Sequence, residues 1–117
     1  MSIRIDKPWI PFTRENVVAM GGQLGVYELA NEEGQTVFIG KAGARTLFGL
    51  RGELMGHLET PGISGFRYEV NSAYLTRYQE LLMVWLAAHD TLPALNTDDV
   101  TRLGRLHPAG IAARRGR

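Results

Sequence analysis

The stretch LGVYELANEEGQTVFIGK, residues 24–41, decides the fold of this chain. Its first half, Gly25–Leu29, is rich in Val, Tyr and Leu, and its second half, Thr36–Ile39, is β-branched and aromatic, a composition that favours strands. Gly34, in the polar segment between them, can adopt the positive φ that a tight turn needs. The stretch therefore predicts a β-hairpin, after which the chain turns toward a helix at residues 40–43.

Sequence patterns outside the hairpin predict three helices and one further strand. Thr13 is a helix N-cap residue, so a short helix is expected from Arg14 to about Met20. Leucine spacing indicates a second helix between Thr46 and Leu58, and alternation indicates a strand over Gly65–Asn71. The longest helix is expected over Ala73–His89. This order predicts an α+β fold in which a small three-stranded antiparallel sheet is flanked by helices.

Length and composition are those of one compact domain, because 117 residues at 44% hydrophobic can bury a core. We divide the chain into an N-terminal arm with a short helix (1–23), a core domain (24–97), and a short helix followed by a basic tail (98–117). There is no cysteine, which excludes disulfides and thiolate metal sites. No segment resembles a membrane span or a signal peptide, so we expect a cytoplasmic protein with no membrane partner.

The charges are distributed unevenly along the chain. Residues 1–99 hold 8 Lys and Arg against 12 Asp and Glu, whereas residues 100–117 hold 5 arginines and no acid. The body is therefore mildly acidic and the tail is basic. A nucleic-acid partner would have to be held by a local basic patch or by the tail, in which Arg114, Arg115 and Arg117 are the candidate contacts.

Two tripeptides of the hairpin resemble the paired signatures of the GIY-YIG nuclease superfamily. Gly25-Val26-Tyr27 resembles the first signature, and Phe38-Ile39-Gly40 resembles the second. Lys41-Ala42 is similar to the residues that follow the second signature in the excision-repair branch, and Leu92–Asn96 resembles the Pro-x-x-Asn close of the domain. The resemblance covers roughly residues 24–96.

The resemblance implies an endonuclease, a hydrolase that cuts phosphodiester bonds with the help of a divalent metal ion. In that mechanism Tyr27 helps to activate a water, and Arg51 on the next helix binds the scissile phosphate, with Arg45 as a rival. His57 resembles a histidine that some members carry further along the same helix, and Lys41 neutralises phosphate charge. A glutamate on the long helix holds the ion, for which Mg²⁺ is suited.

The sequence departs from the family pattern at two positions. Phe38 keeps the ring of the second signature tyrosine but has no hydroxyl. Val84 stands where the resemblance places the metal glutamate, and Val cannot bind Mg²⁺. Glu80 lies one turn earlier on the same helix face, so it is the candidate metal ligand, displaced by about 5–6 Å along the helix axis.

Three functional hypotheses follow. The leading one is a nucleic-acid-binding module with a degenerate metal site, which contacts phosphate through Lys41, Arg45, Arg51 and the tail. The second is an active Mg²⁺-dependent endonuclease whose rearranged site uses Tyr27, Arg51, His57 and Glu80. The third is a protein-interaction or homodimerisation domain, indicated by the acidic body and by residues 81–88, which are apolar all round.

Each singled-out residue also has an ordinary structural interpretation. Tyr27 and Phe38 can be core aromatics of a strand, and Arg51 can be a solvated cation. Glu80 can be a helix-surface acid that pairs with Arg77, three residues before it. These alternatives depend on which side chains the fold brings together.

Overall fold

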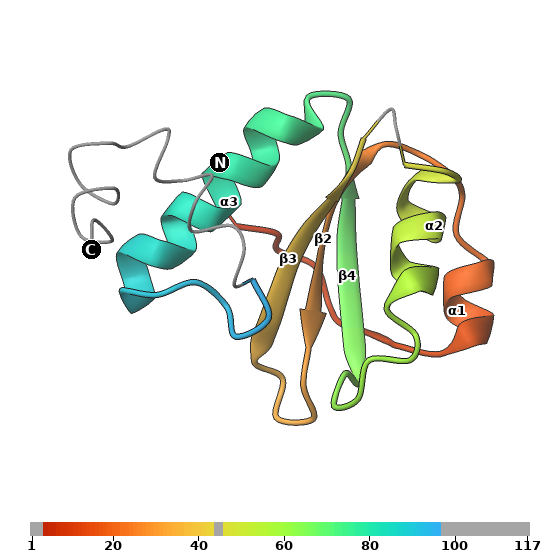
Figure 1. Cartoon of the computed structure of the whole chain (residues 1–117), viewed down its shortest axis with the longest axis horizontal. Coiled ribbons are helices and arrows are strands. Elements are labelled where there is room, and N and C mark those ends of the chain that lie inside the picture. The colour runs from red at the N-terminus through yellow and green to blue at the C-terminus, as the bar shows by residue number, and fades with distance from the viewer. Residues whose placement is uncertain (1–3, 44–45, 97–117) are drawn as a thin grey trace, which may run out of the picture.

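The computed structural model describes residues 4–43 and 46–96. Its elements, in chain order, are β1 (Ile10–Pro11), α1 (Arg14–Val18), β2 (Gly25–Ala30), β3 (Thr36–Ala42), α2 (Gly49–Gly56), β4 (Gly65–Val70) and α3 (Tyr74–His89). The strands form one sheet in the order β1-β4-β2-β3, and every pairing is antiparallel. The α+β class predicted from the sequence is confirmed (Figure 1).

The predicted hairpin is formed by β2 and β3. Gly34 has φ +78° in the turn, and the side-chain oxygen of Asn31 accepts hydrogen bonds from the backbone N–H groups of Glu33 and Gln35. The pairing register places Tyr27 opposite Gly40. Turn chemistry and strand composition therefore agree along this stretch.

The sheet has four strands, so the prediction of three was wrong by one. The additional strand, β1, has only two residues, which pair with Phe66 and Gly65 of β4. A segment of this length shows no alternation, and Pro11 lacks the N–H of a typical strand residue, which explains why the sequence pattern did not reveal it. As an edge strand of two residues, β1 ties the N-terminal arm to the sheet.

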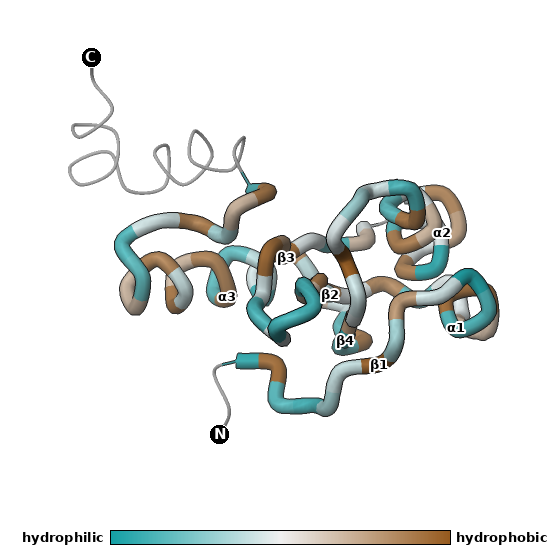
Figure 2. The backbone as a smooth tube through the Cα atoms, turned by 90° about the horizontal axis from the view of Figure 1, so that it is seen from below, coloured by the Kyte–Doolittle hydropathy of each residue, from teal (hydrophilic) through white to brown (hydrophobic). Residues whose placement is uncertain are grey.

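The sheet lies between two layers of helix, with α3 on one face and α1 and α2 on the other (Figures 1 and 2). Because neighbouring residues of a strand point to opposite faces, Val26 packs toward α3 and Tyr27 toward α2. Each face has its own buried cluster. The α3 face buries Ile5, Val26, Ile39, Tyr78, Leu81, Leu82 and Leu92. The α2 face buries Val17, Met20, Tyr27, Leu29, Ala42, Leu50, Leu54 and Phe66.

Helix α2 begins at Gly49, later than the predicted Thr46, because Phe48 has a left-handed backbone with φ +66°. Close packing explains two glycines of the helix, Gly49 and Gly52, whereas a Cβ on Gly56 would meet nothing within 4 Å. A Cβ on Gly49 would lie 2.2 Å from the carbonyl oxygen of Gly22, and one on Gly52 would lie 1.9 Å from that of Leu47. The helix start therefore fits directly against the chain that precedes the hairpin.

Helix α3 is buried less completely than its apolar sequence predicts. Leu81 and Leu82 are buried, residues 83–86 are half-buried, and Ala87 and Ala88 are exposed. None of the helices within the described residues combines the length and the apolar character that crossing a bilayer requires. The short helix and basic tail expected over residues 98–117 lie outside the described residues.

The segment after α3 returns along the free edge of β3. The side chain of Asn96 is 1% exposed and bonds both backbone groups of Ile39, accepting from its N–H at 2.8 Å and donating to its C=O at 2.8 Å. The N–H of Leu95 donates to the carbonyl oxygen of Val37 at 2.9 Å. These bonds satisfy backbone groups of the edge strand that no neighbouring strand reaches.

Candidate acid–base site

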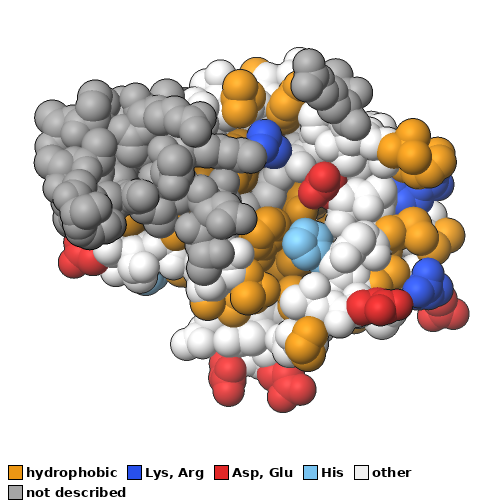
Figure 3. Space-filling view, viewed as in Figure 1, with side chains coloured by type: hydrophobic (Ala, Val, Ile, Leu, Met, Phe, Trp, Pro, Cys, Tyr) orange, Lys and Arg blue, Asp and Glu red, His pale blue; other side chains and the backbone are white. Residues whose placement is uncertain are grey.

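The face of the molecule seen in Figure 3 carries a histidine with an acidic side chain close by, bordered by hydrophobic side chains. Beneath this surface, Tyr27 of the central strand β2 is fully buried. Its ring passes across Gly40 of β3, where an added Cβ would lie only 2.3 Å from the Tyr27 Cζ atom. Gly40 therefore leaves the space through which the Tyr27 ring reaches helix α2.

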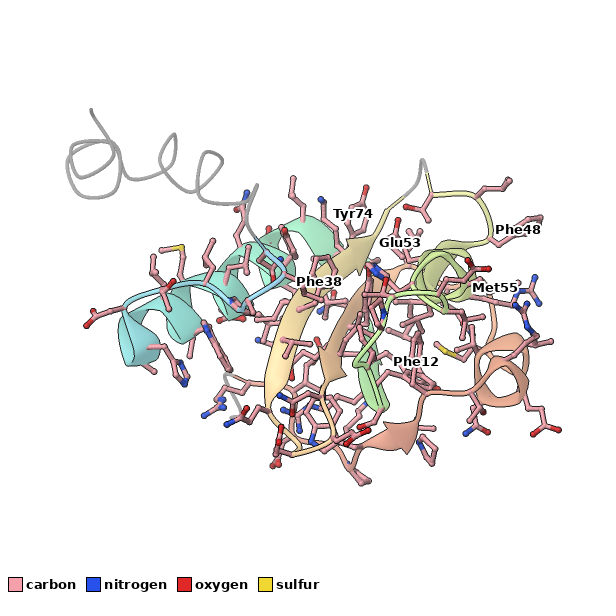
Figure 4. All side chains as sticks on the ribbon, turned by 60° about the horizontal axis from the view of Figure 1, so that its bottom comes forward. Phe12, Phe38, Phe48, Glu53, Met55 and Tyr74 are labelled. Carbon is pink, nitrogen blue, oxygen red and sulfur yellow. The ribbon has the colours of Figure 1, made fainter. Side chains whose placement is uncertain are left out.

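The Tyr27 hydroxyl contacts one side chain of α2 and the side chain of its C-cap residue. It donates a hydrogen bond to Glu53 Oε1 at 2.9 Å and lies 3.0 Å from His57 Nε2. Glu53 and His57 are four residues apart, which places them on one face of the helix. The Thr46 hydroxyl lies 3.5 Å from the other Glu53 oxygen. Figure 4 shows Glu53 between the end of β3 and α2.

His57 lies against aromatic rings, and this environment decides its charge. The ring centroid of Phe38 is 4.8 Å away and that of Tyr27 is 5.8 Å away. Burial lowers the pKa of His57 from its ordinary value, while the negative charge of Glu53 acts in the opposite direction and only partly compensates. The imidazole is therefore neutral at pH 7 and is able to accept a proton.

Arg51, the predicted phosphate ligand, lies away from this group. Its guanidinium carbon is 5.5 Å from the ring centroid of Phe48. In Figure 4, Phe48 and Met55 lie on the side of α2 opposite Glu53. Of the four residues predicted to be catalytic, the structure brings only Tyr27 and His57 together.

Glu80 and Lys41 lie on the α3 side of the sheet, away from the side that Tyr27 faces. The Glu80 carboxylate pairs with the Arg77 guanidinium at 2.6 Å, and Arg77 also pairs with Glu69 of β4 at 2.9 Å. The Lys41 ammonium is 4.5 Å from the centroid of the Tyr78 ring. The ordinary interpretation of Glu80, an ion pair with Arg77, is present in the structure.

The residues that the resemblance assigns to a metal ion do not assemble around Tyr27. Val84 lines a hollow of about 20 Å³ with Ile39 and Leu81 on the α3 face, and Glu80 is engaged by Arg77. The described residues contain no group of three or more His, Asp or Glu side chains arranged to hold a metal ion. The side chains at these positions therefore do not fit the Mg²⁺ site that the resemblance implies.

Sequence reasoning missed Glu53, although it accepts a hydrogen bond from Tyr27 directly. The available signal was its spacing of four residues from His57, which places the two side chains on one face of the predicted helix. The predicted nucleic-acid contacts Arg45, Arg114, Arg115 and Arg117 lie outside the described residues, so the structure does not place them.

Residues 1–88 match a family described as a domain of unknown function (DUF7508). The match spans most of the chain, so the protein belongs to this family. No curated protein and no solved structure matches the chain.

Proposed function

We propose that this DUF7508 domain is a GIY-YIG-like enzyme that hydrolyses phosphodiester bonds in nucleic acid through Tyr27, His57 and Glu53. One observation carries the proposal: the hydroxyl of Tyr27 contacts both a carboxylate of helix α2 and a histidine at the end of that helix. The α+β fold and the β2–β3 hairpin support it. Glu53, and not Glu80, is the carboxylate that contacts Tyr27, and the proposal gives it no metal ion to hold.

His57 supplies the general base in this proposal. Neutral imidazole accepts a proton from a water as the water oxygen bonds to phosphorus, and the imidazolium then returns that proton to the oxygen that leaves. Glu53, linked to His57 through the Tyr27 hydroxyl, stabilises the imidazolium by its negative charge. No step is assigned to a metal ion, because the residues that should hold it do not fit.

A second candidate is nucleic-acid binding without hydrolysis. It is favoured by Phe38, which lacks the signature hydroxyl, and by Val84 at the metal position. The arginines of the tail would then hold phosphate groups, and affinity would fall steeply as salt is raised.

Cleavage of labelled single- and double-stranded DNA and RNA tests both candidates, with Mg²⁺, Mn²⁺ or a chelator and with binding recorded in the same samples. We expect cleavage by the unaltered protein and a loss of about 10²–10⁴-fold in His57→Asn and in Glu53→Gln. Glu59→Gln, at an exposed position just after α2, is the matched control and should cleave normally.

The outcomes separate the hypotheses. Full activity in His57→Asn and Glu53→Gln would remove these residues from the mechanism, and a loss confined to Glu80→Gln would restore the site expected from the sequence. Salt-sensitive binding without cleavage would support the second candidate. If there is neither cleavage nor binding, light scattering at high concentration tests the remaining hypothesis, a homodimer.

A further inference from the structure

We infer that Tyr27 is a positioning residue, which connects Glu53 to His57 and leaves Nδ1 of His57 as the proton acceptor of the site. The hydrogen-bond arrangement follows from the structure alone, and only its use in hydrolysis rests on the proposed function. Which of the two imidazole nitrogens carries the hydrogen decides whether the other can accept a hydrogen bond from a ligand.

The direction of the hydrogen bonds determines that nitrogen. The Tyr27 hydroxyl has one proton, and it donates that proton to Glu53 Oε1 at 2.9 Å. Toward His57 the same hydroxyl must then act as an acceptor, and Nε2, 3.0 Å away, must carry the hydrogen. Neutral imidazole has one N–H, so Nδ1 keeps its lone pair.

Packing holds this arrangement in place. Tyr27 is fully buried and its ring lies in the space left by Gly40, so the ring has no room to turn aside. Phe38 lies against the rings of both Tyr27 and His57, and its ring centroid is 5.9 Å from that of Tyr27 and 4.8 Å from that of His57. The buried Tyr27 hydroxyl therefore lies between the Glu53 carboxylate and the His57 imidazole. In acid–base triads, by contrast, the carboxylate bonds the imidazole directly.

The inference restricts the chemistry of the ligand at His57. A lone pair on Nδ1 accepts a hydrogen bond, so the group bound there must donate one, as a water or a hydroxyl group does. Within the described residues no side chain is seen to donate to Nδ1 of His57. The site is therefore arranged for a hydroxylic nucleophile, which Nδ1 deprotonates while Nε2 stays bonded to Tyr27.

Nitrogen-15 NMR of the imidazole rings tests this inference without any substrate. The signals of His57 are assigned by their loss in His57→Asn, and each nitrogen is identified as protonated or unprotonated at pH 7.5. We expect hydrogen on Nε2 in the unaltered protein. In Glu53→Ala the Tyr27 proton has lost its acceptor and can turn to Nε2, so the form with hydrogen on Nδ1 should gain population.

A double-mutant cycle shows whether Tyr27 carries the effect. In the Tyr27→Phe background, which keeps the ring, Glu53→Ala should change the tautomer less than it does in the unaltered protein. Glu59→Gln should leave the tautomer unchanged. Hydrogen on Nδ1 in the unaltered protein, or an unchanged tautomer in Glu53→Ala, would overturn the inference. If the tautomers behave as expected but no nucleic acid is cleaved, only the proposed function fails.

Discussion

The carboxylates on the two faces of the sheet have different kinds of bonding partner. On the α3 face, Arg77 is 9% exposed and pairs with both Glu69 and Glu80, so the negative charges meet a cation. On the α2 face, Glu53 is bonded to a phenol, and no ion pair to it is found within residues 4–43 and 46–96. The first arrangement anchors a helix, whereas the second leaves a charge that can act on His57.

The largest expected effect is on the chemistry of the α2 face. Under the proposed function, His57→Asn should reduce cleavage by about 10²–10⁴-fold, because the proposed proton acceptor is lost. Its folding should change little, since His57 is half-buried at the helix end. Rates from single-turnover cleavage, with thermal unfolding measured in parallel, check this expectation. Equal losses of activity and of folded protein would make His57 a structural residue.

On the α3 face, substitutions should change the free energy of unfolding. Arg77→Met removes the ion-pair partner of Glu69 and leaves it the hydrogen bond from Asn71. We expect a loss of about 2–3 kcal/mol in the free energy of unfolding, less than for a fully buried pair because Glu69 is partly exposed. Urea denaturation measures it. In the matched variant Glu80→Gln, Arg77 keeps Glu69, so the loss should be under about 1 kcal/mol. Similar losses in both variants would contradict this division of roles.

Gly40→Ala tests whether the Tyr27 ring needs the space beside Gly40 to reach Glu53 and His57. The new methyl group would meet the Tyr27 ring, where an added Cβ comes within 2.3 Å of Cζ. We expect a cost of about 1–3 kcal/mol in stability and a shift of the Tyr27 hydroxyl from its partners. Urea denaturation and the His57 nitrogen signals report the two effects. A variant with unchanged stability and tautomer would show that the ring has more room than the structure gives it.

The smallest expected effect is that of pH. Burial lowers the pKa of His57 below its unfolded value of 6.5, so the folded protein binds fewer protons at this site than the unfolded chain does. The stability from this group is fully present above pH 6.5 and is lost as pH falls through the lowered pKa. Urea denaturation from pH 7.5 to 5 should show a smaller decline in His57→Asn. An equal decline in both proteins would count against a neutral, buried imidazole.

The sequence was sufficient for much of the fold and for two of the three residues of the site, Tyr27 and His57. Alternation and turn residues located the β2–β3 hairpin, and they placed Tyr27 within it. Glu53 was missed because its contact with Tyr27 spans 26 residues and depends on which face of α2 meets the sheet. That face is set by the buried Leu50 and Leu54, whose depth the sequence pattern alone does not report.

Lys41 shows a second limit of sequence reasoning. It follows Gly40 directly, so the alternation of strand residues turns it to the face opposite Tyr27, where it lies over Tyr78. Proximity in sequence suggested a shared phosphate site, and only the register of the sheet separates the two. Glu80 was misplaced for a similar reason, since the sequence does not state which face α3 covers.

The bonds between Asn96 and Ile39 also prevent the edge strand β3 from pairing with a strand of another copy of the chain at this position. Another chain can add a strand to an uncovered edge strand, and repeated addition of strands produces aggregates. The family match ends at residue 88, before this cover begins. A fragment trimmed to the matched residues would therefore be less soluble than the chain that retains Asn96, because the edge of β3 would lie open.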